Sequence, residues 1–527
     1  MDHHDRATQK ISAQVRDFHA QKTPFKIYHG YTNSTRKTLC SRSRMIDTSN
    51  LNNVLRVDTV NKVALVEPNV SMEKLVKTTL QYGLIPPVVP EFPSITIGGG
   101  FAGTAGESSS FRHGFLDTTV DWIEIVIPNG DIFIASRIEN ADLFDGVKGT
   151  FGSLGVTTLL AVRLIPAKPY VALTYRTLSG TEATLESLRQ SIQRNEDDFI
   201  EAIQYSRTGA VLLTGKLSDG TDAYPIQTFQ RPEDEWYYLH VGQKLEGKPR
   251  SHTELVPLVD YYFRYDRGAF WTGRYVFTYF GVPFTRWLRQ IFDHFLHTKI
   301  LYHGLHEGVM ANENIIQDIA IPWNNVMEFL DWLDQNYGIY PLWLCPIKKD
   351  QSASVYRKLG QTNVQDDPIL PNGHLEEFTK AKLGEKEALS MTPANVSDDM
   401  QDYIISIGVW GPRMPKGTDP VAANRKLEAK VKQLGGLKWL YAHNHYTPQE
   451  FWENYDKQWY DDLRTKYHAE YLPSMYDKTR FDWEAERKAI QSSTLRWVFS
   501  FVWWIWPMPG IYGLICCLCG SEYLVSK

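Results

Sequence analysis

The segment from Ile95 to Gly114, ITIGGGFAGTAGESSSFRHG, combines glycines with hydroxyl side chains. Gly98, Gly100 and Gly103 fit the spacing G-x-G-x-x-G, and Asp121 follows about twenty positions later, as in dinucleotide-binding motifs. Backbone without Cβ atoms can approach a ligand closely, and free N–H groups in such a segment can bind a pyrophosphate. The residues therefore indicate a site for a phosphate-bearing cofactor.

The elements around the glycines do not match a Rossmann unit. That unit needs a strand before the glycines and a long helix with apolar spacing after them. Here the proline-rich stretch LIPPVVPEFPS precedes them, and the small, polar stretch TAGESSSFRHG follows. We therefore interpret the spacing as coincidental and expect many free N–H groups in a different fold. A glycine loop without any ligand is the alternative.

Periodicity and turn residues predict the elements that must position this segment. The run from Ser71 is expected to form a helix with Ser71 as N-cap and Gly83 as C-cap. Two apolar, β-branched runs around Pro128–Asp131 predict a hairpin over 118–136. A second glycine-rich segment, Gly149 to Val156, leads into a further strand. The other expected elements are strands over 62–68, 172–178, 340–348 and 407–411, helices over 181–199 and 324–338, and a polar surface insertion over 362–396.

Composition narrows the function further. The protein of 527 residues is long enough for two or three domains, and its hydrophobic content of 43% is globular. A net charge of −5 without a basic run gives no reason to expect nucleic acid. The five cysteines do not form a disulfide pattern, so we expect a reducing compartment. They also do not form two metal-binding pairs, so we expect no metal.

The two ends of the protein differ. Residues 1–22 are charged and are expected to form a surface helix without a signal peptide. The run from Trp497 to Cys519 carries no charged residue, and about 20 apolar residues span a bilayer. Because Pro507 and Pro509 interrupt it, we expect a kinked span or a shallow hairpin in the membrane. A buried core segment is the alternative.

Several strings resemble a known family. VEPNVSMEKLV, TIGGGFAGTAGESSS, DLFDGVKGTFGSLGVTT and RLIPAKPYV are similar to the FAD-binding domain of the vanillyl-alcohol-oxidase or PCMH-type flavoproteins, and most of all to the delta-24 sterol reductases. Further along, IIQDIAIP, YPLWLCP and LYAHNHYTPQEFWENYD resemble the cap and C-terminal segments of those reductases. The resemblance covers most of Phe25 to Lys478.

The resemblance implies an α+β fold, with a two-subdomain PCMH-type FAD-binding domain, an α+β cap domain for the substrate and an apolar C-terminal membrane segment. The implied boundaries are 1–22 for the N-terminal helix, 23–168 for the FAD-binding domain, 169–435 for the cap, 436–486 for a segment that returns to the flavin, and 495–519 for the membrane segment.

The resemblance also implies site residues. The first phosphate loop would be YHGYTNSTR, residues 28–36, and Arg264 and Arg267 would hold a cofactor phosphate or pair with Asp266 and Asp260. The candidates for proton donation are Tyr441, His443, His445 and Glu450. The cofactor-binding candidates are Thr96, Ile97, Gly98, Gly99, Gly100, Phe101, Ala102, Gly103, Thr104, Ala105, Gly106, Glu107, Ser108, Gly152 and Gly155.

The implied activity is reduction of a carbon–carbon double bond in the side chain of a sterol or related triterpenoid, with FAD as cofactor and NADPH as electron donor. FAD is expected to be non-covalent, because neither His29 nor His113 lies in an attachment motif. The implied location is the endoplasmic reticulum membrane, with the catalytic domain facing the cytosol and the apolar tail in contact with lipid. An FAD-linked oxidase or dehydrogenase of an alcohol or secondary metabolite, and a non-catalytic sterol-binding protein, are the alternatives.

Overall fold

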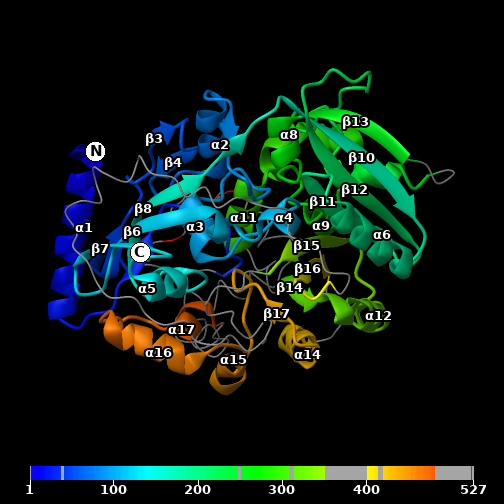
Figure 1. Ribbon diagram of the computed structural model, residues 1–527. Helices are drawn as coiled ribbons and strands as arrows, with labels where there is room; N and C mark the ends of the chain where they lie inside the picture. The colour runs from blue at the N-terminus through cyan, green and yellow to red at the C-terminus, as the bar shows by residue number, and fades with distance from the viewer. Residues whose placement is uncertain are drawn as a thin grey trace.

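The computed structural model describes residues 2–36, 41–246, 251–307, 314–349, 400–412 and 419–480, together with Ile515 and Leu524. Two mixed α and β domains lie side by side, and a C-terminal segment runs along both (Figure 1). The predicted α+β content is confirmed. The expected surface insertion and, apart from Ile515, the expected membrane segment lie outside the described residues. Within the described part of the protein, no helix is long and apolar enough to cross a membrane.

The N-terminal domain is built on an antiparallel sheet of five strands. Their order across the sheet is β3 (Val54–Asp58), β4 (Val63–Val66), β8 (Val156–Arg163), β6 (Val120–Val126) and β7 (Ile132–Ser136). Two small sheets accompany it, a parallel pair of β1 (Lys26–Tyr28) and β2 (Met45–Asp47) and an antiparallel pair of β5 (Leu84–Ile85) and β9 (Ile165–Pro166). The glycine segment is therefore not part of a Rossmann unit, and Asp121 pairs with Arg163 at 2.9 Å.

The cap domain contains an antiparallel sheet of eight strands. Their order is β13 (Ser251–Pro257), β10 (Tyr170–Leu178), β12 (Gly209–Ser218), β11 (Phe199–Ser206), β15 (Leu342–Lys348), β16 (Tyr403–Pro412), β14 (Asn314–Pro322) and β17 (Leu437–Lys438). Strand β17 comes from the start of the C-terminal segment, so this segment begins at the edge of the cap sheet.

The helices are short except at the periphery. The N-terminal domain has α1 (Asp2–Ala20), α2 (Met72–Leu80), α3 (Ile97–Ala102), α4 (Ser110–His113) and α5 (Ala141–Val147). The cap has α6 (Thr181–Arg194), α7 (Tyr237–Gln243), α8 (Leu258–Tyr262), α9 (Gly273–Phe280), α10 (Arg286–Ile291), α11 (Thr298–Glu307), α12 (Val326–Asn336) and α14 (Pro420–Gln433). The C-terminal segment adds α15 (Pro448–Asn454), α16 (Lys457–Lys466) and α17 (Met475–Thr479).

Most predicted elements are present at the expected places. Strands β6 and β7 form the predicted hairpin, and Ser71 caps α2 by accepting a hydrogen bond from the Lys74 amide. The helix ends at Leu80 rather than at Gly83, because Gly83, with a φ of 68°, lies in the turn that leads to β5. The local signal for a glycine turn was therefore right, but the helix ends earlier.

Helix α1 packs one face onto the N-terminal domain. Its His4 is buried between two carboxylates, at 2.9 Å from Glu67 and 3.0 Å from Glu124. Although burial lowers the pKa of His4, the two carboxylates outweigh this and raise it to about 9. Helix α1 is therefore fixed to strand β6 and to the residue that follows β4 by a buried cation.

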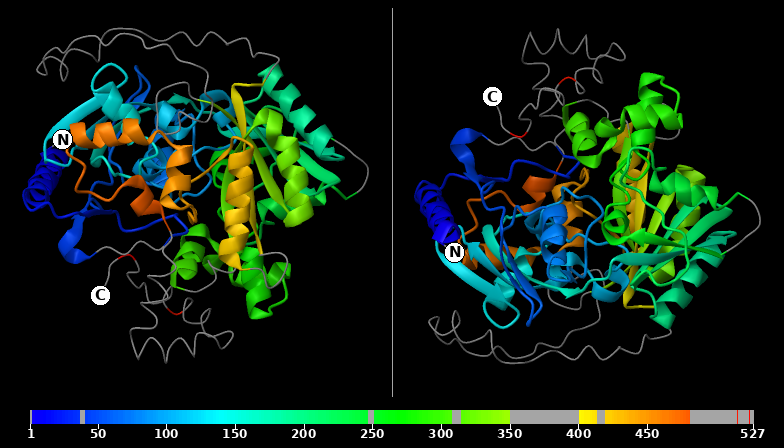
Figure 2. Two further views of the ribbon diagram at one scale, coloured as in Figure 1. Left: turned by 90° about the horizontal axis from the view of Figure 1, so that it is seen from below. Right: turned by 90° about the horizontal axis from the view of Figure 1, so that it is seen from above.

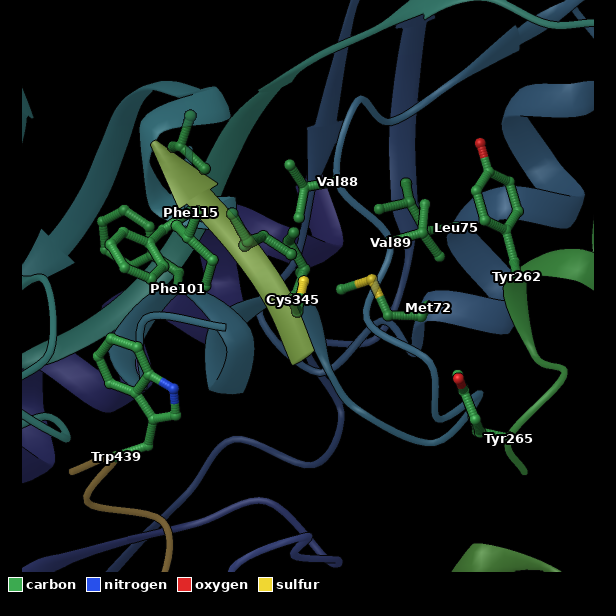
Figure 3. Close-up of a cluster of buried hydrophobic side chains, with 14 of the residues drawn as sticks. Met72, Leu75, Val88, Val89, Phe101, Phe115, Tyr262, Tyr265, Cys345 and Trp439 are labelled. Carbon is green, nitrogen blue, oxygen red and sulfur yellow. The ribbon is translucent and has the colours of Figure 1, made fainter. Parts of the chain in front are cut away.

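One apolar core is continuous across both domains. Figure 3 shows Cys345 of β15 between side chains of the N-terminal domain, including Val88 and Phe115, with Trp439 of the C-terminal segment nearby. At this junction the Ile200 amide donates to the Ser108 carbonyl at 2.8 Å. The domains are thus joined by a packed interface rather than by a linker alone.

The C-terminal segment connects the two domains a second time. After β17 it passes under the N-terminal domain, where α16 lies beside α5 (Figures 1 and 2). Tyr460 of α16 donates to Ser153 at 2.7 Å, and Lys478 donates to the carbonyls of Phe151 and Gly152. The polypeptide beyond the cap therefore packs against the second glycine-rich segment.

Candidate active site

A cavity of about 670 Å³ lies between the N-terminal domain and the cap. This is within the size range of small-molecule sites, roughly 300–1,000 Å³. The N-terminal wall consists of the glycine segment and the first-loop residues, and the cap wall consists mainly of aromatic and aliphatic side chains. The N-terminal wall includes His29, Tyr31, Thr32, Asn33, Ser34, Glu91, Thr96, Gly99, Gly100, Gly103, Thr104, Ala105, Gly106 and Phe151.

The glycine segment winds into the short helix α3. The Thr96 hydroxyl caps it by accepting from the Gly99 amide at 3.1 Å, and the Gly103 amide donates to the Gly99 carbonyl at 2.9 Å. The expectation of many free N–H groups is therefore wrong for this turn, because the helix uses them. The amides of Thr104 and Gly106 make no hydrogen bond within the described residues, and both residues line the cavity. These two groups remain for a ligand.

The predicted cofactor-binding residues divide into two sets. Seven of them line the cavity, namely Thr96, Gly99, Gly100, Gly103, Thr104, Ala105 and Gly106. The others are not among the lining residues, because α3 turns one face inward and the backbone then enters the domain junction. This second set is Ile97, Gly98, Phe101, Ala102, Glu107, Ser108, Gly152 and Gly155.

Glycine is required at several of these positions for packing. A Cβ at Gly98 would lie 2.7 Å from the Cβ of Pro68, and a Cβ at Gly106 would lie 3.0 Å from the Ile347 side chain. Gly152 adopts a φ of 69°, which favours glycine. Some of the glycines therefore bring backbone elements together, and others open the cavity wall.

Arg36, at the end of the predicted first phosphate loop, is a buried cation. Its guanidinium donates to the Leu440 carbonyl at 2.6 Å and to the Lys478 carbonyl, and it lies over the Phe151 ring. Among the described residues no carboxylate pairs with it, and burial lowers its pKa to about 10, so it stays charged at neutral pH. A buried cation surrounded by carbonyls is stabilised by a nearby anion such as a pyrophosphate.

The cap wall is apolar with one conspicuous polar pair. Tyr441 donates a hydrogen bond to the Asp318 carboxylate at 2.9 Å, and both residues line the cavity. The other Asp318 oxygen, Oδ1, is buried with no hydrogen-bond partner among the described residues. Burial raises the pKa of Asp318 to about 7, and burial with the neighbouring carboxylate raises that of Tyr441 well above its usual range. The surrounding wall includes Phe270, Phe277, Phe295, Leu301, Tyr302, Ile316, Trp343, Trp410 and Trp439.

Of the four predicted proton donors, only Tyr441 lies at the cavity. Burial and the cations Lys438 and Arg36 lower the pKa of His443 to about 3, and burial with Lys438 lowers that of His445 to about 2. Both imidazoles are therefore neutral near pH 7. Glu450 lies on the surface, where it completes the capping box of α15 and pairs with Arg425 at 2.9 Å. Its match to the family pattern reflects a helix cap.

The two predicted phosphate-binding arginines have other partners. Arg264 is buried at the junction, where it pairs with Glu201 at 2.9 Å and lies over the Tyr261 ring. Arg267 pairs with Asp293 at 2.7 Å. Neither residue lines the cavity, and neither forms an ion pair with Asp266 or Asp260. Both alternatives offered from sequence are therefore wrong.

Sequence reasoning missed two acidic residues of the cavity wall. Asp318 lies inside β14, and the signal in the sequence that points to it is an acid within a largely apolar strand. Glu91 comes from the proline-rich approach to the glycines, and burial and the nearby Glu107 raise its pKa well above its usual range. Its Oε1 has no hydrogen-bond partner in the described residues. Only the fold brings these two acids to the same cavity.

Comparisons with known proteins agree with this architecture. Residues 6–136 match the model of an FAD binding domain. Delta(24)-sterol reductase of Rattus norvegicus is 28% identical over 486 residues, covering 90% of this protein and 86% of the relative. The enzyme of that name from Pisum sativum is 28% identical over 448 residues, covering 80% and 74%. Cytokinin dehydrogenase 9 of Oryza sativa subsp. japonica is 30% identical over 158 residues, covering 30% of each protein.

The matched domain and the site define a flavin-binding protein. Residues 6–136 are similar to an FAD binding domain, and over most of its length the chain is similar to the delta-24 sterol reductases. The residues present fit FAD. The free amides of Thr104 and Gly106 suit close approach by polar atoms of the ligand. Arg36 is not itself among the lining residues, but its guanidinium lies over the ring of the lining residue Phe151, where its charge suits a pyrophosphate.

Proposed function

We propose that this protein is an FAD-dependent reductase of a carbon–carbon double bond in the side chain of a sterol or related triterpenoid, with NADPH as electron donor. The supporting observation is a single cavity with a glycine-lined wall for a flavin and an apolar wall that carries one proton-bearing pair. The names of the relatives that align over most of the sequence support the same assignment.

The chemistry explains why both walls are needed. Reducing an isolated alkene requires a hydride at one carbon and a proton at the other, and reduced FAD supplies the hydride. Tyr441 holds a proton at its Oη on the cap wall. The aromatic side chains around it exclude water, which keeps the proton and the reducing equivalents from reacting elsewhere.

The test is a spectral titration of the purified flavoprotein without oxygen. NADPH should bleach the yellow flavin, and a sterol with an unsaturated side chain should restore the colour. The matched control is the same sterol with a saturated side chain, which should leave the flavin reduced. Protein that binds sterol but no flavin, or a flavin that stays reduced with every unsaturated sterol, would overturn the proposal.

An oxidase or dehydrogenase on this fold is a second candidate, because His29 lines the cavity. A histidine at that position could carry a covalent flavin, whereas His113 is not among the lining residues. We propose non-covalent FAD, so acid precipitation should leave the yellow colour in the supernatant. Colour in the pellet, together with peroxide formed from an alcohol in air, would favour the oxidase.

We also propose that the enzyme works on the cytosolic face of the endoplasmic reticulum membrane. At one end of the cavity, next to the lining residues Phe292 and Phe295, helix α10 exposes Trp287 and Ile291. The exposed charged groups nearby include the cations Arg286 and Lys299 and one acid, Glu233, whose carbonyl accepts a hydrogen bond from Arg286, whereas Asp293 is buried. Exposed apolar and basic side chains together suit an anionic lipid surface. The apolar run 497–519 would add a second attachment.

This membrane proposal predicts a difference between two substrate preparations. In the full-length protein, the double variant Trp287→Ser/Ile291→Ser should lower turnover of sterol in phosphatidylserine-containing vesicles several-fold and leave turnover of detergent-dispersed sterol unchanged. Ile226→Ser is the matched control, because Ile226 is similarly exposed at a site outside the cavity lining. Equal turnover of vesicle sterol by all three proteins would exclude α10 as the docking surface.

A further inference from the structure

We propose that Asp318 and Tyr441 act as one proton-donating pair, in which Tyr441 delivers the proton to the alkene and Asp318 returns a proton to the Tyr441 oxygen. This inference rests on the proposed function and names a residue that the sequence did not suggest. Asp318 does not need to touch the sterol. It acts through Tyr441 and is therefore a positioning and proton-supplying residue.

The fold fixes the two side chains from several directions. Asp318 lies within β14, and its carbonyl accepts a hydrogen bond from the Trp439 amide at 2.9 Å, directly after β17. The Tyr441 carbonyl accepts from the Ser34 hydroxyl at 2.7 Å and from the Thr35 amide at 3.1 Å. Tyr441 thus hydrogen-bonds to the cap through its side chain and to the first phosphate loop, residues 28–36, through its backbone. The pair is therefore held at the boundary between the two walls.

Acidity explains why a tyrosine alone is insufficient. Burial and the adjacent carboxylate keep the pKa of Tyr441 far above neutrality. Its hydroxyl is therefore a weak acid, and forming its phenolate costs free energy. The pKa of Asp318, about 7, means that a substantial fraction of this group is a carboxylic acid near neutral pH. A protonated Asp318 can transfer its proton to the Tyr441 oxygen as that oxygen releases its own, so no phenolate accumulates.

Among the described residues, no fixed charge around Asp318 opposes the proton transfer from Asp318 to the Tyr441 oxygen. The titratable groups that face Asp318 are Tyr441 and, from α11, Tyr302. On the adjacent strand β17, Lys438 pairs its ammonium group with Glu428 at 2.7 Å. Aromatic residues and backbone from β16 complete the enclosure. The protonation state of Asp318 is therefore set by burial and by its hydrogen bond to Tyr441.

The step balances. The O–H bond of Tyr441 breaks as a C–H bond forms at one alkene carbon, and bound, reduced FAD would supply the hydride for the C–H bond at the other carbon. The Asp318 proton moves to the Tyr441 oxygen, which leaves Asp318 as a carboxylate. After the product leaves, water in the open cavity reprotonates that carboxylate. The net change is addition of one hydride and one proton across the double bond and oxidation of the flavin.

The decisive variant is Asp318→Asn in the flavin-loaded, full-length protein. Its amide can still hydrogen-bond Tyr441 but cannot return a proton. We expect sterol-dependent reoxidation of the flavin to slow on the order of 10²-fold, while FAD occupancy and reduction by NADPH stay unchanged. In the wild type, reoxidation should fall as the pH rises through about 7, because Asp318 loses its proton. In Asp318→Asn this dependence should disappear.

A second tyrosine–aspartate pair offers a matched control. Tyr340 donates to Asp334 at 2.9 Å, and neither residue lines the cavity. Asp334→Asn should therefore keep wild-type reoxidation and its pH dependence.

Infrared spectroscopy tests the protonation of Asp318 without turnover. In the infrared spectrum of the wild type, one protonated-carboxyl component should be present at pH 6 and fade as the pH rises through about 7, and among these proteins that component should be missing only in Asp318→Asn, whereas the component from Glu91 remains in all of them.

The outcomes separate the two proposals. If the wild type reoxidises with sterol but Asp318→Asn reoxidises equally fast with the same pH profile, this inference is overturned and the proposed function stands. An infrared spectrum in which Asp318→Asn removes no band at pH 6 overturns it as well. If no sterol alkene reoxidises the wild-type flavin, the proposed function fails, and this inference fails with it.

Discussion

The N-terminal wall of the cavity comes largely from one continuous run, Pro90 to Gly106, whereas the cap wall is assembled mainly from α9, residues 292–296, α11, β14–β16 and residues 439–441. The glycine segment of the first wall offers backbone groups and little side-chain volume. The second offers aromatic surface and a single acidic pair. A cofactor used in every turnover needs close backbone contact, and a bulky apolar substrate needs a water-poor surface. The difference between the walls is therefore the one expected if the N-terminal wall binds the cofactor and the cap wall binds the substrate.

The largest expected effect comes from filling the N-terminal wall. In Gly103→Val, a Cβ would lie 3.0 Å from the Gly99 carbonyl oxygen, and the added methyl groups would enter the cavity. We expect a folded protein that purifies without flavin colour, measured by absorbance and circular dichroism. Gly103→Ala should retain part of the flavin.

Gly209→Val is the matched control for that substitution. A Cβ at Gly209, on β12 of the cap, would meet only atoms of other side chains, the nearest at 3.3 Å. This variant should keep full flavin occupancy. A folded Gly103→Val protein with full occupancy would show that the glycine segment is not the flavin wall.

The next largest effect should come from the cap wall. Tyr441→Phe removes the hydroxyl that donates to Asp318 but keeps the ring. We expect normal FAD binding and normal reduction by NADPH, with sterol turnover slower on the order of 10²-fold for a lost general acid. Tyr340→Phe, which breaks the corresponding pair away from the cavity, should not change turnover. Unchanged turnover in Tyr441→Phe would move the search to Glu91.

These two walls were not equally visible in the sequence. The glycine segment and Tyr441 were found because each belongs to a contiguous, recognisable string. Asp318 and Glu91 were missed because their importance depends on burial and on strands that pair only in the folded protein.

Local patterns predicted the β6–β7 hairpin and helix α2 but could not show what their side chains contact. Glu450 illustrates the limit, since a capping box and a catalytic acid look alike in one dimension. The free amides of the glycine segment were overestimated for a related reason. The Thr96 hydroxyl and the turn of α3 use several of them, and this depends on backbone conformation rather than on residue type.

The smallest expected effect sharpens the comparison by testing what supports the N-terminal wall. His4 pairs with Glu67, which immediately precedes Pro68, and Pro68 packs against Gly98 of the glycine segment. His4→Gln removes a buried cation between two carboxylates and should lower the free energy of unfolding of this domain by about 3 kcal/mol near pH 6.5. Because the pKa of His4 is raised in the folded state, this stabilisation is full below about 6.5 and is lost as the pH rises through about 9. Thermal unfolding is followed by the release of flavin fluorescence, and the difference in melting temperature between wild type and variant should shrink over that pH interval. The affinity for FAD should be only slightly weaker, and the turnover of flavin-loaded enzyme should be unchanged.

His3→Gln is the control, since His3 is exposed on the same helix. A difference that stays constant up to pH 10 would mean that packing of α1, rather than the charge of His4, holds the helix in place.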